Sequence, residues 1–364
     1  MFLTVLFYVL IAVIFVEILF FSIAAINFKN ITRKPKKSNA AVSLIIYTKN
    51  QADLIKKQLP IFLKQEHENF EIVLINHAST DDSLNVIEKF QKQHSIIKLV
   101  NVKNNEAFWS SKKYALTLGV KAATHEQLVL SSIAFEPQST AWLQYMTAAS
   151  TKKPMVIGFT AHINSNYFYR CLNLLAIVKN YTLGKMGLYY RGTSANVSYS
   201  KKLFFSSNGF VQHMKVPFGE TILFANEVSK KSNTTICLYK DSFVTPVQKP
   251  SFRKWFTEQT KNNLILRHCN TTAQIANGIL FGCHFLFYLL ATFLLFFNAL
   301  DLEILIASLI VARFIAQFFC YGLVVKKIQD LKLLFAIPFF EVFLLVIQFF
   351  IFILILNSKR LHWN

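Results

Sequence analysis

VSLIIYTKNQADLIKKQLPIFLKQEHENFEIVLINHASTDDS, residues 42–83, carries the clearest fold signal in this chain. Residues 42–46 are all apolar except for Ser43, a pattern typical of a parallel strand that is covered on both faces. Residues 51–65 place apolar side chains at helical spacing, and residues 70–75 form a second, mostly apolar run. The order strand, helix, strand predicts a βαβ unit, in which both strands lie parallel in one sheet.

The alternation of strands and helices continues beyond this stretch. The next helix is expected to end near residue 93, with Ser79 or Thr80 as its N-cap and Asp82 beside its first-turn N–H groups. Further segments follow in the same order: a strand at 96–102, a helix at 110–123, a buried strand at 128–130 and, later, a strand at 155–159. We therefore predict an α/β fold with a mostly parallel sheet, whose ligands bind at the carboxyl ends of the strands.

Four apolar runs, each about 20 residues or longer, are long enough to cross a bilayer as helices; they are residues 2–27, 275–300, 305–325 and 333–356. The first run has no basic segment before it and no cleavage site after it, so it is predicted to be a retained anchor. The predicted organisation is an N-terminal transmembrane anchor at 1–28, a soluble domain at 29–272 and about three transmembrane helices at 273–364. The soluble domain is expected to end in a basic, aromatic interface helix at 251–263.

The region between the first and second apolar runs carries almost all of the chain's net charge of +20. Basic residues crowd the exit of the first run: Lys29, Arg33, Lys34, Lys36 and Lys37. The positive-inside rule therefore predicts that the soluble domain is cytoplasmic and that the protein lies in the cell (inner) membrane. Counting four spans places Lys359 and Arg360 on the far side. Either this tail departs from the rule, or the segment with Pro338 and Glu341 does not fully cross.

Two of the three charged side chains inside the apolar runs, Arg313 and Glu341, are expensive to bury in a membrane. Arg313 and Glu341 are expected to pair with each other, to pair with a partner chain or to reach the interface. We expect no further paired polar residues in the spans, which disfavours a transport pathway. Residues 167–190 are mostly apolar and aromatic, with dispersed basic residues, and are either a helix on the membrane surface or an ordinary core helix.

The strong basic charge has two readings. No recognised nucleic-acid motif is present, so no nucleic-acid partner is expected. An anionic membrane surface and a phosphate-bearing ligand suit a domain tethered on both sides. The five cysteines show no C-x-x-C spacing, so they predict neither a disulfide framework nor a zinc site.

Five stretches in the expected order resemble membrane-bound family 2 glycosyltransferases with a GT-A nucleotide-sugar domain. They are VSLIIYTKNQADLIKKQLPIFLKQ (42–65), NFEIVLINHASTDDS (69–83), FWSSKKYALTLGVKAATHEQLVL (108–130), PFGETILFANEV (217–228) and WFTEQTK (255–261). The resemblance covers residues 41–261. It implies a GT-A fold that binds a nucleotide sugar, and a transfer reaction helped by Mg²⁺ or Mn²⁺ that is held by Asp residues.

The residues at the family's catalytic positions depart from that pattern. The base-contacting Asp is His77, the D-x-D metal loop is Ser132-Ile133-Ala134, and the acids that supply the general base are reduced to Glu220. No Asp lies anywhere between Asp82 and Asp241. The resemblance places the nucleotide pocket at Thr48, Asn50, His77, Ser79, Lys112, Ser132, Ala134 and Lys261. We therefore expect no metal cofactor.

Several of these residues have a plainer reading. Glu220 is either a surviving general base or a solvated loop acid. His77 either contacts a nucleobase or is a core histidine, and Lys112 and Lys113 either meet a diphosphate or lie on a solvated helix face.

The loss of several motifs in a preserved scaffold predicts a catalytically silent member of the family. Such a protein would act as a scaffold or ligand-binding subunit in a membrane complex. Its expected partners are membrane lipids, a membrane protein, and a nucleotide sugar or lipid-linked glycan. The alternative is a divergent active enzyme that moves a sugar from a nucleotide-sugar donor to a lipid or polysaccharide acceptor. A third reading is an unrelated membrane-anchored binding module.

Overall fold

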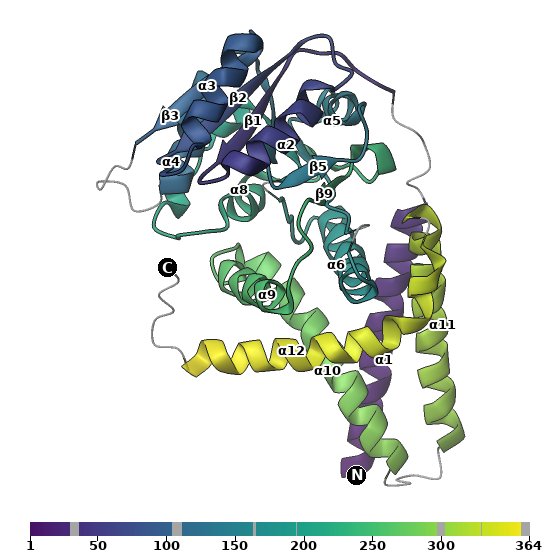
Figure 1. The fold of residues 1–364 in the computed structure, drawn as a ribbon. Coiled ribbons are helices and arrows are strands. Elements are labelled where there is room, and N and C mark those ends of the chain that lie inside the picture. The colour runs from purple at the N-terminus through teal and green to yellow at the C-terminus, as the bar shows by residue number, and fades with distance from the viewer. Residues whose placement is uncertain are drawn as a thin grey trace. The chain divides into compact units, whose positions relative to one another are not determined.

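The computed structural model describes residues 1–29, 36–103, 111–162, 165–193, 195–296, 303–328 and 330–357. The chain divides into two compact units (Figure 1). The helical unit comprises Met1–Thr32, Asn166–Tyr189 and Asn270–Asn364. The sheet unit comprises Arg33–Ser165 and Tyr190–Cys269.

The sheet unit is built on a seven-stranded sheet with the order β3-β2-β1-β4-β7-β6-β8. Its strands are β1 (Val42–Thr48), β2 (Phe70–His77), β3 (Ile97–Val102), β4 (Gln127–Ser132), β6 (Met155–Ile157), β7 (Val197–Ser200) and β8 (Thr234–Ile236). The first four strands in this order pair in parallel, whereas β7 is antiparallel to both of its neighbours. A separate two-stranded sheet joins β5 (Phe135–Pro137) to β9 (Val244–Pro246). The predicted mostly parallel α/β sheet is confirmed.

Helices cover both faces of the large sheet. They are α2 (Ala52–Leu63), α3 (Ser83–Gln93), α4 (Ser111–Ala122), α5 (Trp142–Ser150), α7 (Lys201–Ser206) and α8 (Glu220–Val228). The sheet unit also contains α9 (Phe252–Leu266) and the short 3-10 turns η1 (Val211–His213) and η2 (Lys240–Ser242). Successive residues of a strand point to opposite faces. Leu44 and Ile46 therefore join the core with Phe62 of α2, whereas Ile45 joins the core with Leu116 of α4. This double burial explains why residues 42–46 read as a nearly unbroken apolar run.

The helical unit contains four helices that are long and apolar enough to cross a membrane. Its elements are α1 (Phe2–Lys29), α6 (Tyr167–Met186), α10 (Thr271–Phe296), α11 (Glu303–Ile328), the 3-10 turn η3 (Leu331–Ala336) and α12 (Ile337–Asn357). The helices α1, α10 and α11 run in a similar direction, and α12 runs across them (Figure 1).

The helix α6 packs within the helical unit, although the sequence leaves its environment open. The ring of Tyr181 lies 4.6 Å from the ring of Phe28 at the end of α1. Tyr167 donates a hydrogen bond to the carbonyl of Lys332 (2.8 Å), and Arg170 forms an ion pair with Asp330. In the sheet unit, residues 252–266 form the helix α9, most of whose side chains are at least partly exposed; its place at a membrane interface stays a prediction.

The charged residues in the apolar runs find partners inside the helical unit. The guanidinium of Arg313 lies 2.8 Å from the carboxylate of Glu341, so the first of the three alternatives holds. The expectation that the spans lack further paired polar residues is wrong, because Glu17 and His284 join the same cluster. A charge that looks isolated in its own apolar run can be satisfied by another helix, which no single run of sequence shows.

Asn196 is a buried connector in the sheet unit, and its replacement by Ala is expected to lower the free energy of unfolding by about 3 kcal/mol. Its amide donates to the carbonyls of Phe159 and Ser242 (both 2.8 Å) and accepts from the indole N–H of Trp142 (3.1 Å). Asn196→Ala removes the side-chain partner of the Ser242 carbonyl and of the Trp142 indole N–H, whereas the Phe159 carbonyl still accepts from the N–H of Val244 (3.2 Å); chemical denaturation of the purified protein would detect the loss. Asn85→Ala, at an exposed position, is the control; an equal loss in both variants would contradict the assignment.

Candidate functional site

Two loops meet at the carboxyl edge of β1 and β2. Asn50 adopts a left-handed backbone conformation (φ 52°), which Asn tolerates better than most residues. Its backbone N–H donates to Ser79 Oγ (3.0 Å), and its side-chain oxygen accepts from the N–H of Thr80 (2.8 Å). The hydroxyl of Thr48 donates to the carbonyl of Ile75 (2.9 Å). Three of the predicted pocket positions, Thr48, Asn50 and Ser79, therefore lie together.

The predicted N-cap of α3 is wrong. Asp82 occupies the cap position without a side-chain cap hydrogen bond, and Ser79 instead donates to Asn76 Oδ1 (2.6 Å). The carboxylate of Asp81 accepts from the N–H groups of Ala52 and Ser83 (both 3.0 Å). The polar residues of this loop join two loops to each other instead of capping one helix, which holds the edge of the sheet in a fixed shape.

Tyr47 and His77 form a polar pair at this edge. The Tyr47 hydroxyl lies 2.7 Å from His77 Nδ1, and His77 is buried. Burial, with a smaller contribution from the charge of Lys49, lowers the pKa of His77, so the ring is neutral at pH 7. Burial and the charge of Glu220 raise the pKa of Tyr47 to about 12, so its hydroxyl keeps its proton.

His77 Nε2 has no hydrogen-bond partner among the residues that the structure describes. A buried polar atom without a partner is costly, and it marks a place where a ligand or an ordered water can bind. This is the position where the family resemblance places the nucleobase contact. The buried location also fits a core histidine. The structure is therefore compatible with both interpretations of His77, a nucleobase contact and a core histidine.

Glu220 is the first residue of α8 and forms a close ion pair with Lys112. The distance from Lys112 Nζ to Glu220 Oε1 is 2.5 Å, and the Glu220 side chain is only 7% exposed. The Lys112 ammonium also lies 5.3 Å from the centre of the Tyr47 ring. The structure therefore brings Glu220, Lys112, Tyr47 and His77 into one chain of contacts. Glu220 is a buried, paired carboxylate, and the reading as a solvated loop acid is wrong.

Lys113 lies behind this pair and does not face solvent. It is fully buried, and its ammonium donates to the carbonyls of His213 (2.6 Å) and Val216 (2.5 Å). Burial lowers the pKa of Lys113 to about 8. Neither reading from the sequence, a diphosphate contact or a solvated helix face, describes this lysine.

The ionisation of Glu220 is decided by competing effects. Burial would raise the pKa of its carboxyl, but the ion pair and hydrogen bond with Lys112, and the charge of Lys113, outweigh burial and hold it below the usual value of 4.5. Glu220 is therefore a carboxylate at neutral pH whose charge is already neutralised. To accept a proton as a general base, it would have to give up the contact with Lys112.

The loop at the end of β4 holds the positions of the family's metal ligands. The register of β1 and β4 places Ser132 opposite Tyr47. Ile133 is fully buried, and Ala134 accepts a hydrogen bond at its carbonyl from the N–H of Val247 (2.9 Å). The loop offers one hydroxyl and no carboxylate, whereas Mg²⁺ and Mn²⁺ favour carboxylate oxygens. No group of three His, Cys, Asp or Glu side chains within the described ranges could hold a metal ion. The donors of this loop do not fit a divalent cation.

Lys261 lies on α9, with its ammonium 3.8 Å from Glu258 of the same helix. The start of α8 packs against α9, because a Cβ placed on Gly219 would lie 2.7 Å from Ile265. The positive φ of Gly219 (76°) also favours glycine. Tyr47 and Gly219 are site residues that the sequence analysis missed. The signals available for them were a tyrosine at the end of the first strand and a glycine directly before the surviving acid.

Comparison with known proteins shows what the sequence of this chain is similar to. Residues 43–191 match the family model of glycosyl transferase family 2. The chain resembles, over 94 residues with 32% identity, the dolichyl N-acetyl-alpha-D-glucosaminyl phosphate 3-beta-D-2,3-diacetamido-2,3-dideoxy-beta-D-glucuronosyltransferase of Methanococcus voltae (24% of this chain, 27% of the relative). An uncharacterized glycosyltransferase of Haemophilus influenzae is 33% identical over 75 residues (21% of this chain, 23% of the relative). The chain thus matches about a quarter of the length of these relatives.

A solved structure supports the fold over most of the chain. The mannosyltransferase PcManGT from Pyrobaculum calidifontis, solved in complex with GDP-Man and Mn²⁺, superposes with a TM-score of 0.58 at 16% identity. The match covers 90% of this chain and 99% of that one. The predicted GT-A fold and the resemblance to membrane-bound family 2 glycosyltransferases are confirmed.

Lys112→Met is expected to destabilise the protein by about 3 kcal/mol at pH 7, because it leaves the buried Glu220 carboxylate unpaired. In the wild type the pKa of Glu220 is below 4.5, so its stabilising contribution is present above pH 4.5 and is lost as the pH falls below that value. In the variant, the buried Glu220 carboxyl has lost Lys112, and burial raises its pKa. Protonation of Glu220 in acid then removes the cost of burying an unpaired carboxylate.

The difference in the free energy of unfolding between wild type and variant should therefore shrink between pH 7 and pH 4. Chemical denaturation in detergent at both pH values measures it, and Lys121→Met, at an exposed position of the same helix, is the control. A difference that is the same at both pH values would contradict the ion-pair assignment.

Proposed function

We propose that this protein is a membrane-bound, catalytically silent relative of family 2 glycosyltransferases, which binds a ligand or partner without transferring sugar. The observation that carries the proposal is the ion pair between Glu220 and Lys112. The one acid at the family's base position is buried and already neutralised by a lysine 2.5 Å away.

A general base needs a proton affinity that suits the reaction. Base catalysis is most effective when the pKa of the base lies near the working pH. The pKa of Glu220 lies below 4.5, because Lys112 and Lys113 stabilise the carboxylate against the effect of burial. An acceptor hydroxyl would have to give its proton to a weak base that is held by a cation.

The leaving group presents a second difficulty. Transfer from a nucleotide sugar releases a nucleoside diphosphate, whose developing charge must be stabilised by a cation or by hydrogen-bond donors. Ser132 and Ala134 supply no carboxylate that could hold a metal, and the buried Ile133 lies between them. We therefore propose that the protein uses no Mg²⁺ or Mn²⁺ in this loop.

The pocket keeps features that suit a bound ligand. At the edge of the sheet, His77 Nδ1 contacts the Tyr47 hydroxyl, whereas His77 Nε2 has no partner among the described residues. Relatives suggest the ligand class, because PcManGT binds GDP-Man and the Methanococcus voltae enzyme is named for a dolichyl-linked glycan phosphate. A nucleotide sugar or a lipid-linked glycan is thus our proposed ligand, with membrane lipids and a partner membrane protein as further contacts.

The membrane placement follows from charge. Lys29 ends α1, and Lys326 and Lys327 lie at the end of α11. By the positive-inside rule, these ends face the cytoplasm. We propose that the protein lies in the cell (inner) membrane with the sheet unit in the cytoplasm and the segment between α10 and α11 on the far side.

An active enzyme is the second candidate, and one observation favours it. Lys112 is 38% exposed beside the base position, so its ammonium can reach a bound anion if it releases Glu220. A lysine could then offset part of the diphosphate charge in place of a metal. The effect of replacing Glu220 distinguishes this candidate from the silent protein.

Glu220→Gln is expected to restore function in a deletion strain of the native host, because the silent protein needs no base. An active enzyme would lose about 10²–10⁴-fold of its rate when the base is removed. Glu88→Gln, at an exposed helix position, is the matched control. If Glu220→Gln fails to complement while its protein level equals that of the control, the active candidate replaces the silent one.

Nucleotide-sugar binding is expected to be equally strong with Mn²⁺ and with a chelator, because the loop at Ser132 holds no metal ligands. Calorimetric titration of the full-length protein with UDP- and GDP-sugars measures the affinity. His77→Ala should weaken binding by about tenfold, the loss of roughly one hydrogen bond, and His94→Ala should not. Binding that requires Mn²⁺ would refute the proposed loss of the metal site.

A further inference from the structure

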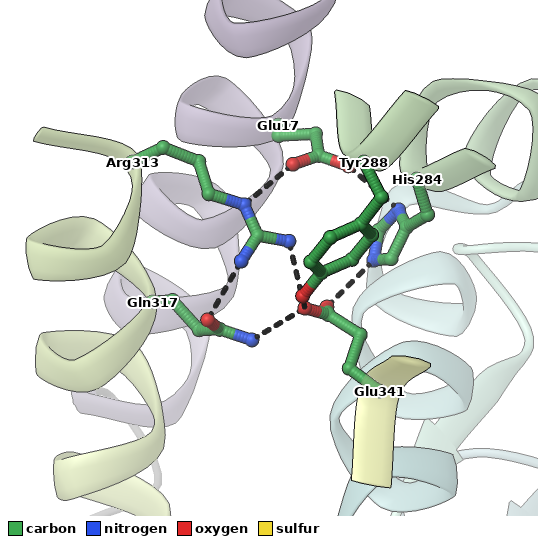
Figure 2. A network of polar contacts seen from close by, with 6 residues as sticks. All are labelled: Glu17, His284, Tyr288, Arg313, Gln317 and Glu341. Carbon is green, nitrogen blue, oxygen red and sulfur yellow. Dashed lines mark hydrogen bonds and ion pairs between the residues drawn. The ribbon is translucent and has the colours of Figure 1, made fainter. Parts of the chain in front are cut away.

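Four membrane-length helices meet at one buried polar network. Its members are Glu17 of α1, His284 and Tyr288 of α10, Arg313 and Gln317 of α11, and Glu341 of α12 (Figure 2). Arg313 lies at the centre and is fully buried. Its guanidinium donates to Glu17 (2.6 Å), to Gln317 (2.7 Å) and to Glu341 (2.8 Å).

His284 closes the network on its other side. Its Nδ1 lies 2.9 Å from a Glu17 oxygen, and its Nε2 lies 3.0 Å from a Glu341 oxygen. Both ring nitrogens lie close to carboxylate oxygens, and an imidazolium at this place carries a proton on each of them. With Arg313 and His284 charged, the two carboxylates are balanced, so the network can be buried without net charge.

Glu341 is the member of the polar network that α12 contributes. Its carboxylate also accepts from the Tyr288 hydroxyl (2.7 Å) and from the Gln317 amide (3.1 Å). Glu341 lies within the first two turns of α12, whereas Glu17, His284 and Arg313 lie near the middle of their helices. The beginning of α12 is therefore fixed between α10 and α11, away from their ends.

Beyond Glu341, α12 runs across α1, α10 and α11 instead of alongside them (Figure 1). Many of its apolar side chains are exposed along its whole length: Phe339, Val342, Val346, Phe349, Phe350, Phe352, Ile353, Leu354 and Leu356. Such a long apolar surface is stable only when an apolar phase covers it. The backbone of a helix is hydrogen-bonded internally, so a helix can lie in lipid in any direction.

We propose that α12 lies along the membrane and packs its exposed side chains against the acyl chains of one leaflet, instead of crossing the bilayer. The leaflet is the one that contains Lys29, Lys326 and Lys327, because only the short turn η3 separates α12 from the basic end of α11. The basic residues after α12, Lys359 and Arg360, lie outside the described residues, and this topology places them on the same side as the other basic residues.

With α12 along the membrane, the basic residues Lys359 and Arg360 no longer conflict with the positive-inside rule. A crossing α12 would place Lys359 and Arg360 on the far side, against the positive-inside rule. It would also have to turn parallel to α11, away from the direction in which Glu341 meets Arg313 and His284. The proposal concerns membrane topology, and it does not depend on whether the sheet unit is catalytically active.

The position of the C-terminus tests the proposal in the full-length protein. A specific protease site is placed after Asn364, and separate variants carry the same site at Lys231 of the sheet unit or within residues 297–302. In sealed vesicles, the sites after Asn364 and at Lys231 should be cut or protected together, and the site at 297–302 should behave oppositely. A C-terminal site that behaves like the one at 297–302, or that divides between the two sides, would overturn the proposal.

A second measurement tests whether the network holds α12. Glu341→Leu removes the polar attachment of α12, while the ring contacts of Phe340 and Phe343 with Phe168 of α6 remain. It also removes a charged group that opposes membrane crossing, so the fraction of C-termini on the far side should rise about tenfold or more. Tyr288→Phe removes one hydroxyl and keeps the pairs of Arg313 and His284, so it should not change the topology. An unchanged C-terminus in Glu341→Leu would overturn the role of the network. The wild-type measurement stands even if this variant does not fold.

Discussion

The pairing of β1 with β2 on one side and β4 on the other is the constraint on which the sheet unit depends. Because β1 is covered by helices on both faces, its register is fixed by two hydrophobic cores at once. The parallel direction then brings the ends of three strands to the same edge. Tyr47, His77 and Ser132 meet there for this reason alone, whatever chemistry they perform.

Each unit contains a buried charge system with its own balance. In the sheet unit, Glu220 has a dominant cation, Lys112, while the charge of Lys113 is satisfied by backbone carbonyls. In the helical unit, the charges of Glu17 and Glu341 are shared by two cations. A buried pair adds little stability compared with apolar packing, but the loss of one partner is costly. Both systems therefore specify positions more than they add stability: one fixes the start of α8, and the other fixes the start of α12.

The sequence was informative where the hydrophobic pattern was long. The strands β1 to β4 and the helices between them could be predicted because each has several residues with a clear period. The strands β5, β8 and β9 have three residues each, too few to show a period, and the antiparallel direction of β7 depends on tertiary pairing. The candidate site divides in the same way: its positions followed from family resemblance, but the burial of Lys113 and the ion pair of Glu220 did not.

The polar network shows a different limit. Arg313 and Glu341 could be recognised as costly charges, but Glu17 and His284 join them from two other helices, α1 and α10. The bond from Arg313 to Glu17 spans 296 positions. The useful signal was the presence of charged side chains of opposite sign in separate apolar runs, which indicates that these side chains pair with one another in the folded protein. The amino-acid composition of α12 does not predict its direction relative to the other helices.

The helix α6 belongs to the helical unit but lies, in sequence, between two parts of the sheet unit, and this affects the order of folding during synthesis. The chain leaves the sheet unit after Ser165 and returns at Tyr190, so the segment between them belongs to the helical unit. Arg170 in this segment pairs with Asp330, which the ribosome adds 160 residues later. Until then, α6 has only part of its packing surface, although the strands on either side of it can already pair. The sheet can form early, but α6 must wait for the last helices, with its apolar face available to chaperones or to the membrane in the meantime.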